Sequence, residues 1–112
     1  MNFKKVIDLT KSVIRRFEKI EGKPWGVNGT MIELSKQVGD LSKLVMTNEG
    51  YYPKGRGKED RQYEATKEKI ADELSDIFFM VIRLSVYYRI DLEKAHIKAL
   101  NSASKYLKSH GV

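Results

Sequence analysis

Residues 70–84, IADELSDIFFMVIRL, carry the most apolar helical pattern in the chain. Apolar side chains recur there mostly at spacings of three and four, at Ile70, Leu74, Ile77, Phe78, Val81 and Leu84. This spacing places them on one side of an α-helix that starts near Gln62, and around residues 77–84 almost the whole circumference becomes apolar. A helix with so wide an apolar surface belongs at the centre of a bundle or of a dimer.

Three further helices are predicted from similar spacing of apolar side chains, in residues 3–20, 30–46 and 92–108. Side chains able to cap their amino-terminal ends are present at Asn2, Thr30 and Asp91. No alternation of apolar and polar residues typical of β-strands stands out. The predicted fold class is therefore all-α, a bundle of about four helices.

Glycine and proline gather in residues 22–29 and 50–57, which we expect to connect the helices. Gly39 is different because it lies inside the second predicted helix. Glycine in a helix interior costs roughly 1 kcal/mol relative to alanine. Its presence indicates either the close approach of another helix or a tolerated defect.

Length and composition describe one helical domain that spans residues 1–112. The chain has 112 residues, of which 41% are hydrophobic and 32% are charged, as expected for a single globular domain. So short a chain buries only a moderate fraction of its surface, and a second copy can cover an apolar helix face that is left exposed. We therefore expect a homo-oligomer, either a dimer or a tetramer.

The chain contains no cysteine, which excludes disulfides, a thiolate zinc site and a cysteine nucleophile. Charged residues recur along residues 1–22, so we expect neither a secretory signal nor a membrane span, and we expect a cytoplasmic protein. The net charge of +6 suits a polyanionic partner. Most cations are spread along the chain, so a simple solvated surface is the alternative explanation of this charge.

Two rows of oxygen-bearing side chains follow helical spacing. Glu73 and Asp76 are three residues apart and project from one face of the third helix. At the edge of an apolar surface they would repel each other unless a cation such as Mg²⁺ neutralised them. The second row lies on the second helix and contains Glu33, Gln37 and Asp40. An antiparallel pairing of the helices would set both rows across one cleft; otherwise the acids simply line a solvated face.

The segments KQVGDL (36–41) and DELSDIFFMVIRLSVYYRIDLEKA (72–95) together resemble the MazG-like nucleotide pyrophosphohydrolases. The hallmark of that family is Glu-x-x-Glu on one helix and Glu-x-x-Asp on the next, and the resemblance covers roughly residues 30–106. Glu73 and Asp76 match the second motif. The first motif departs from the family, because Gln37 replaces a glutamate and Asp40 is a shorter acid than the glutamate it replaces.

The resemblance implies hydrolysis of a nucleoside triphosphate to the monophosphate and pyrophosphate, with Mg²⁺ or Mn²⁺ as the cofactor. It also implies that Asp40, Glu73 and Asp76 are metal ligands. Glu33 and Gln37 are the candidate catalytic positions beside them, and Glu33 can supply the charge that Gln37 lacks. Its alternative role is that of a surface glutamate.

Two groups of cations are candidates for binding the phosphates. One is the loop cluster Lys54, Arg56 and Lys58, and the other is Lys98 and Lys105 on the last helix. By resemblance, the family carries a lysine, an asparagine, an arginine and an aromatic residue on that helix. Lys98 and Tyr106 match the lysine and the aromatic residue, whereas Ser102 and Lys105 replace the other two. Solvated surface positions are the alternative for all five cations.

Aromatic side chains are needed to recognise a base, and the candidates are Trp25, Tyr51, Tyr52 and Phe79. We expect Trp25 to serve as a packing anchor more than as a stacking surface.

Three functions remain open on the sequence alone. The chain is an active Mg²⁺-dependent hydrolase, or a weakened relative that binds a nucleotide or a protein partner, or a basic module that binds nucleic acid through YYPKGRGK (51–58). No nucleic-acid motif supports the third, so nucleic acid is not the expected partner.

Overall fold

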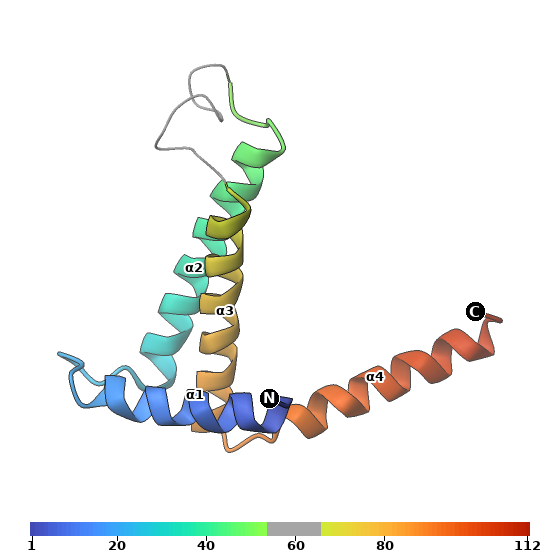
Figure 1. Ribbon diagram of the computed structural model, residues 1–112, viewed down its shortest axis with the longest axis horizontal. Helices are drawn as coiled ribbons and strands as arrows, with labels where there is room; N and C mark the ends of the chain where they lie inside the picture. Colours follow the sequence, from blue (N-terminus) through green and yellow to red (C-terminus); the bar gives the residue numbers. More distant parts are fainter. Residues whose placement is uncertain (54–65) are drawn as a thin grey trace.

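The computed structural model describes residues 1–53 and 66–112. These residues form four helices, α1 (Phe3–Glu18), α2 (Gly26–Asn48), α3 (Lys67–Tyr87) and α4 (Leu92–Ser109), and contain no strand (Figure 1). The predicted all-α fold with four helices is confirmed. None of the helices in the described parts is both long and apolar enough to cross a membrane.

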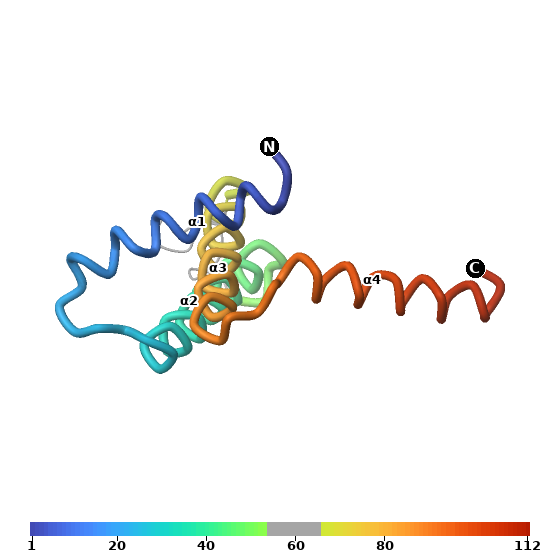
Figure 2. The backbone as a smooth tube through the Cα atoms, turned by 90° about the horizontal axis from the view of Figure 1, so that it is seen from below, coloured from blue at the N-terminus to red at the C-terminus, as the bar shows by residue number. Residues whose placement is uncertain are grey.

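The helices α2 and α3 run antiparallel and pack along each other (Figure 1). Helix α1 lies across α3, as the view in Figure 2 shows. Two pairs of rings join these helices: Phe3 stacks on Phe78 at 6.2 Å between ring centroids, and Phe17 meets Phe79 edge to face at 6.1 Å. The pairing of α2 with α3 is the one that sets the two rows of oxygen-bearing side chains on neighbouring helices.

Helix α4 extends away from the other three helices (Figures 1 and 2). It has no buried residue, and four of its large apolar side chains are exposed: Ile97, Leu100, Tyr106 and Leu107. The apolar surfaces of α2 and α3 are also incompletely covered, with Met31, Val38, Val45, Leu74 and Phe78 all exposed. Leu74 and Phe78 belong to the apolar side predicted for residues 70–84, but one chain alone leaves all five side chains exposed. The apolar core of one chain is therefore incomplete.

Three of the helices begin with a side-chain cap. Asn2 accepts a hydrogen bond from the Lys5 backbone N–H at 2.9 Å, as predicted. Asp91 accepts one from the Lys94 N–H at 3.0 Å, also as predicted. Thr66 does the same for α3. Each cap satisfies a backbone donor that the first helical turn leaves unpaired.

The prediction that Thr30 caps α2 is wrong. The helix begins four residues earlier at Gly26, and Thr30 is fully buried inside it with its hydroxyl donating to the Gly26 carbonyl at 2.7 Å. Gly26 has a φ of +54°, which glycine adopts without strain. A Cβ atom at Gly29 would lie only 2.8 Å from the Trp25 Cβ. These glycines, read from sequence as part of a loop, form the first turn of the helix.

The two explanations for Gly39 can now be separated. A Cβ atom built at Gly39 would meet nothing within 4 Å in the described chain. None of the four described helices approaches Gly39, so within this part of the chain Gly39 is a tolerated helix defect.

A buried arginine fastens the α1–α2 connection to α3. Arg83 is only 2% exposed, and its guanidinium donates to the Glu21 carboxylate and to the Tyr87 hydroxyl. The guanidinium also lies 4.8 Å from the centroid of a Trp25 ring. The backbone N–H of Trp25 donates to the other Glu21 carboxylate oxygen at 3.3 Å. Trp25 therefore anchors the start of α2, in line with the role expected for it.

Candidate functional site

Acidic side chains of α2 and α3 repel each other electrostatically around Glu73. Burial raises the pKa of Glu73, and the negative charges of Asp40 and Asp76 raise it further. Asp40 belongs to α2, whereas Asp76 belongs to α3. The antiparallel pair therefore places acids from both helices close enough to disfavour the ionised form of Glu73.

Replacing Glu73 with glutamine is expected to raise the free energy of unfolding at neutral pH, by less than about 1 kcal/mol because water screens the site. The pKa of Glu73 is higher in the folded chain than its ordinary value of 4.5, so the folded state binds this proton more tightly. The stabilising effect of protonation is full below pH 4.5 and is lost as the pH rises through the raised pKa. Urea unfolding at pH 4 and pH 7 measures this. If the free energies of unfolding of variant and parent differed by the same amount at both pH values, the raised pKa of Glu73 would be contradicted.

A cation already lies beside the acidic row of α2. The Lys36 Nζ donates to Glu33 Oε1 at 3.1 Å, and Gln37 Nε2 donates to the same oxygen at 3.4 Å. The hydrogen bond and the charge of Glu33 raise the pKa of Lys36, and Asp40 and Glu73 add to the effect. The Glu33 carboxylate is therefore held by its own helix, and Lys36 offsets its charge.

The buried amide of Gln37 is incompletely satisfied. Gln37 is 8% exposed, and its Oε1 atom has no hydrogen-bond partner among residues 1–53 and 66–112. An unmade hydrogen bond at a buried polar atom costs about 1–3 kcal/mol. This amide lines a pocket of about 270 Å³ at the junction of α1, α2 and α3, together with Phe17, Ser75, Asp76, Phe79 and Met80.

The acids suit a hard divalent cation in chemistry and in charge. Carboxylate oxygens are the ligands that Mg²⁺ prefers, and a cation would relieve the repulsion that raises the pKa of Glu73. In the described residues, no three His, Asp or Glu side chains are gathered closely enough to hold a metal ion. Asp40 and Asp76 are exposed, so their side chains have room to turn toward Glu73.

Only two of the predicted phosphate-binding cations, Lys98 and Lys105, belong to the described residues, and one chain does not bring these two to the acids. Lys54, Arg56 and Lys58 lie outside the described residues. Lys98 and Lys105 are on α4, which leads away from the α2–α3 pair (Figure 1). These two lysines reach an acidic site only if α4 of one copy meets another copy.

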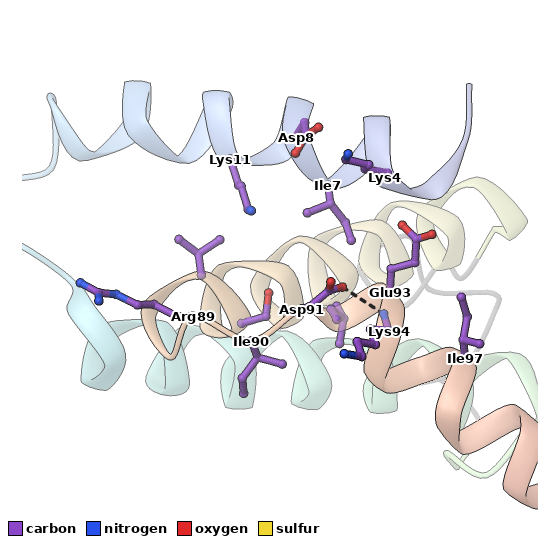
Figure 3. Close-up of a pocket in the computed structure, with 13 residues that line it drawn as sticks. Lys4, Ile7, Asp8, Lys11, Arg89, Ile90, Asp91, Glu93, Lys94 and Ile97 are labelled. Carbon is purple, nitrogen blue, oxygen red and sulfur yellow. Dashed lines mark hydrogen bonds between the residues drawn. The ribbon is translucent and has the colours of Figure 1, made fainter.

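A larger cavity, of about 730 Å³, lies at the carboxyl end of α3 between α1 and the start of α4 (Figure 3). Lys11 projects into it from α1 and Lys4 lines it from the same helix, while Asp91 and Glu93 lie on the opposite side. Charges of both signs therefore share this cavity. It contains none of the predicted site residues and is separate from the acidic row.

No family model, curated protein sequence or solved structure matches this chain. The MazG-like resemblance therefore stays a prediction, and the functional argument depends on the residues themselves.

Proposed function

We propose that this protein is a cytoplasmic, Mg²⁺-dependent pyrophosphohydrolase of MazG-like type, which converts a nucleoside triphosphate to the monophosphate and pyrophosphate. One observation carries the proposal. Burial raises the pKa of Glu73, and the negative charges of Asp40 from α2 and Asp76 from α3 raise it further, so carboxylates of both helices act on Glu73 where the helices meet. Concentrated carboxylates of this kind suit a bound divalent cation.

Each side chain has a proposed role. Glu73, Asp76 and Asp40 would hold Mg²⁺, or Mn²⁺ in its place. The ion would neutralise phosphate oxygens and lower the pKa of bound water. Glu33 is the nearby carboxylate available to accept a proton, and Lys36 and Gln37 hold it in position through the same oxygen.

Release of pyrophosphate tests this function directly. The purified protein is incubated with each common nucleoside triphosphate and Mg²⁺ or Mn²⁺, and pyrophosphate and monophosphate are measured together. We expect equal amounts of both products and none after chelation of the metal. Release of inorganic phosphate in place of pyrophosphate would contradict the proposal.

A weakened relative is the second candidate, and the state of Gln37 favours it. The family's charged ligand is here an uncharged amide whose nitrogen is engaged by Glu33. Such a protein would bind Mg²⁺ and nucleotide without efficient turnover. Metal-dependent nucleotide binding in calorimetry, with no pyrophosphate released, would identify it.

We further propose that the protein is a homo-oligomer in which α4 packs against a second copy. Leu92, Ala99, Leu100, Ala103 and Leu107 share one side of α4 by helical spacing, and α4 has no buried residue in the single chain. The exposed apolar side chains of α2 and α3 provide a matching surface on the same molecule. A second copy of the chain would cover both apolar surfaces at once.

Replacing Leu100 with glutamate is expected to shift the protein to the monomer at micromolar concentration, because the charge would have to be buried in an apolar contact. Leu100 is 55% exposed in one chain, so the fold of that chain tolerates the change. Sedimentation velocity measures the mass. Asn101→Glu, which puts the same charge on the opposite side of α4, should leave the oligomer intact. If both variants were monomeric, the apolar side of α4 would not be the contact between copies.

A further inference from the structure

The cavity of about 730 Å³ at the carboxyl end of α3 has an aliphatic lining. Ile7, which is buried, and Val86 line it from α1 and α3, and the exposed side chains of Ile90 and Ile97 line it from the α3–α4 connection and from α4. By helical spacing Ile97 lies off the side of α4 that we assign to the second copy, so that contact does not cover it. A cavity of this size with apolar walls suits a small organic ligand.

Two half-buried charges of opposite sign face this cavity from its two sides. Lys11 projects into it from α1, and Glu93 reaches toward α1 from the start of α4 (Figure 3). Within the described parts of the chain, neither side chain has an ion-pair or hydrogen-bond partner. Asp91, next to Glu93 on the lining, already accepts the Lys94 backbone N–H. A partly buried charge without a partner is unfavourable, because it loses water and gains no opposite charge in return.

The signs of the two charges decide which ligand fits. An anion would pair with Lys11 but would be repelled by Glu93 across the cavity, and a cation would meet the reverse arrangement. A ligand that carries one charge of each sign at its two ends pairs with both sides, and an aliphatic centre then contacts the apolar lining. We propose that this cavity binds a short aliphatic peptide with free ends, whose carboxylate pairs with Lys11 and whose ammonium group pairs with Glu93.

The placement of the charges on opposite sides favours a peptide over a single amino acid. An amino acid holds its ammonium and carboxylate groups on one carbon atom, so it cannot extend from one side of the cavity to the other. An extended tripeptide separates them by about 10 Å. The cavity contains none of the acids of the proposed metal site. Peptide binding therefore does not depend on the proposed hydrolase activity, and Glu73→Ala should bind peptide as the parent does.

Four related tripeptides test the proposal on the whole chain. They are Ala-Leu-Ala with free ends, its carboxyl-terminal amide, its amino-terminal acetyl form, and Ala-Ser-Ala. Titrations followed by NMR detect weak binding, and Ala-Leu-Ala should bind with a Kd of about 1 mM or tighter. Each of the other three lacks one charge or the aliphatic side chain and should bind about tenfold more weakly. No binding of Ala-Leu-Ala, or equal binding of all four, would overturn the proposal.

Substitutions of the two charged residues assign each end of the peptide. Lys11→Met should remove the advantage of the free peptide over its amide but keep its advantage over the acetyl form. Glu93→Gln should do the reverse, because each variant loses one charge pair and keeps the other. Lys5→Met removes an exposed lysine of α1 that does not line the cavity, and should change none of these ratios. Unchanged ratios in the Lys11 and Glu93 variants, or the same loss for every peptide in both, would refute the pairing.

A second copy of the chain is the other possible occupant of this cavity, and sedimentation velocity distinguishes it from a peptide. Peptide binding predicts that Lys11→Met and Glu93→Gln keep the mass of the parent, and thermal unfolding checks that both variants fold. If both variants changed the mass and no peptide bound to the parent, the cavity would belong to the contact between copies and the proposal would fail.

Discussion

Replacing Glu73 with alanine is expected to reduce pyrophosphate release by roughly a hundredfold or more, because the change removes the carboxylate that we propose as the central metal ligand. Loss of groups that only support metal ligands already costs about 10- to 100-fold in many metal sites. The loss should appear as a lower kcat and as weaker Mg²⁺ dependence. Steady-state kinetics at several Mg²⁺ concentrations measure both.

The neighbouring acid provides the matched control. Asp72 precedes Glu73 on α3 and is exposed, and its charge is the last of the causes that raise the pKa of Glu73. Asp72→Ala should therefore change the rate less than about threefold if the site is specific. Equal losses in both variants would mean that the overall negative charge of α3 matters, and not a metal ligand at Glu73.

The helices and their caps were accessible from sequence because both depend on local spacing. Asn2 and Asp91 cap the helices that the pattern predicted, and residues 70–84 belong to a helix in contact with both α1 and α2. The prediction placed the start of the second helix at Thr30 because glycine, present here at Gly26 and Gly29, is common in loops. Here Gly26 adopts a positive φ at the start of α2, and Gly29 leaves room for Trp25 against the first helical turn.

The surroundings of the site were harder to predict, since they depend on contacts between distant residues. The approach of Asp40 to Glu73 was expected from the pairing of two helices, and the structure agrees with the pairing. The lone oxygen of Gln37 was not expected, because the burial of this side chain depends on how the helices pack against one another. No short sequence pattern predicts the direction of α4. Its apolar side chains are not buried by the single chain, so contacts within one chain do not fix that direction either.

The ion pair between Arg83 and Glu21 could not be predicted from the sequence, because the two residues are 62 positions apart. Arg83 stood there inside an apolar run, IFFMVIRL, where a charge is expected to be costly. Glu21 stood at the end of a helix, with nothing to indicate its partner. Only the fold shows that each satisfies the other.

Replacing Arg83 with methionine is expected to lower the free energy of unfolding by about 3–5 kcal/mol, because it leaves the Glu21 carboxylate without its cation. The Glu21 side chain is 9% exposed and Arg83 is 2% exposed, so water cannot easily replace either partner. The Trp25 ring and the Tyr87 hydroxyl lose the same guanidinium. Urea unfolding at a fixed protein concentration measures the loss.

Two comparisons decide whether the uncompensated charge is the cause. Arg15→Met removes an exposed arginine of α1 and should change the free energy by less than about 0.5 kcal/mol. The double variant Arg83→Met, Glu21→Gln removes both charges and should recover part of the stability lost in the single variant, since a neutral amide is cheaper to bury than a lone carboxylate. A double variant less stable than the single one would show that packing around Arg83, and not its charge, fastens the start of α2 to α3.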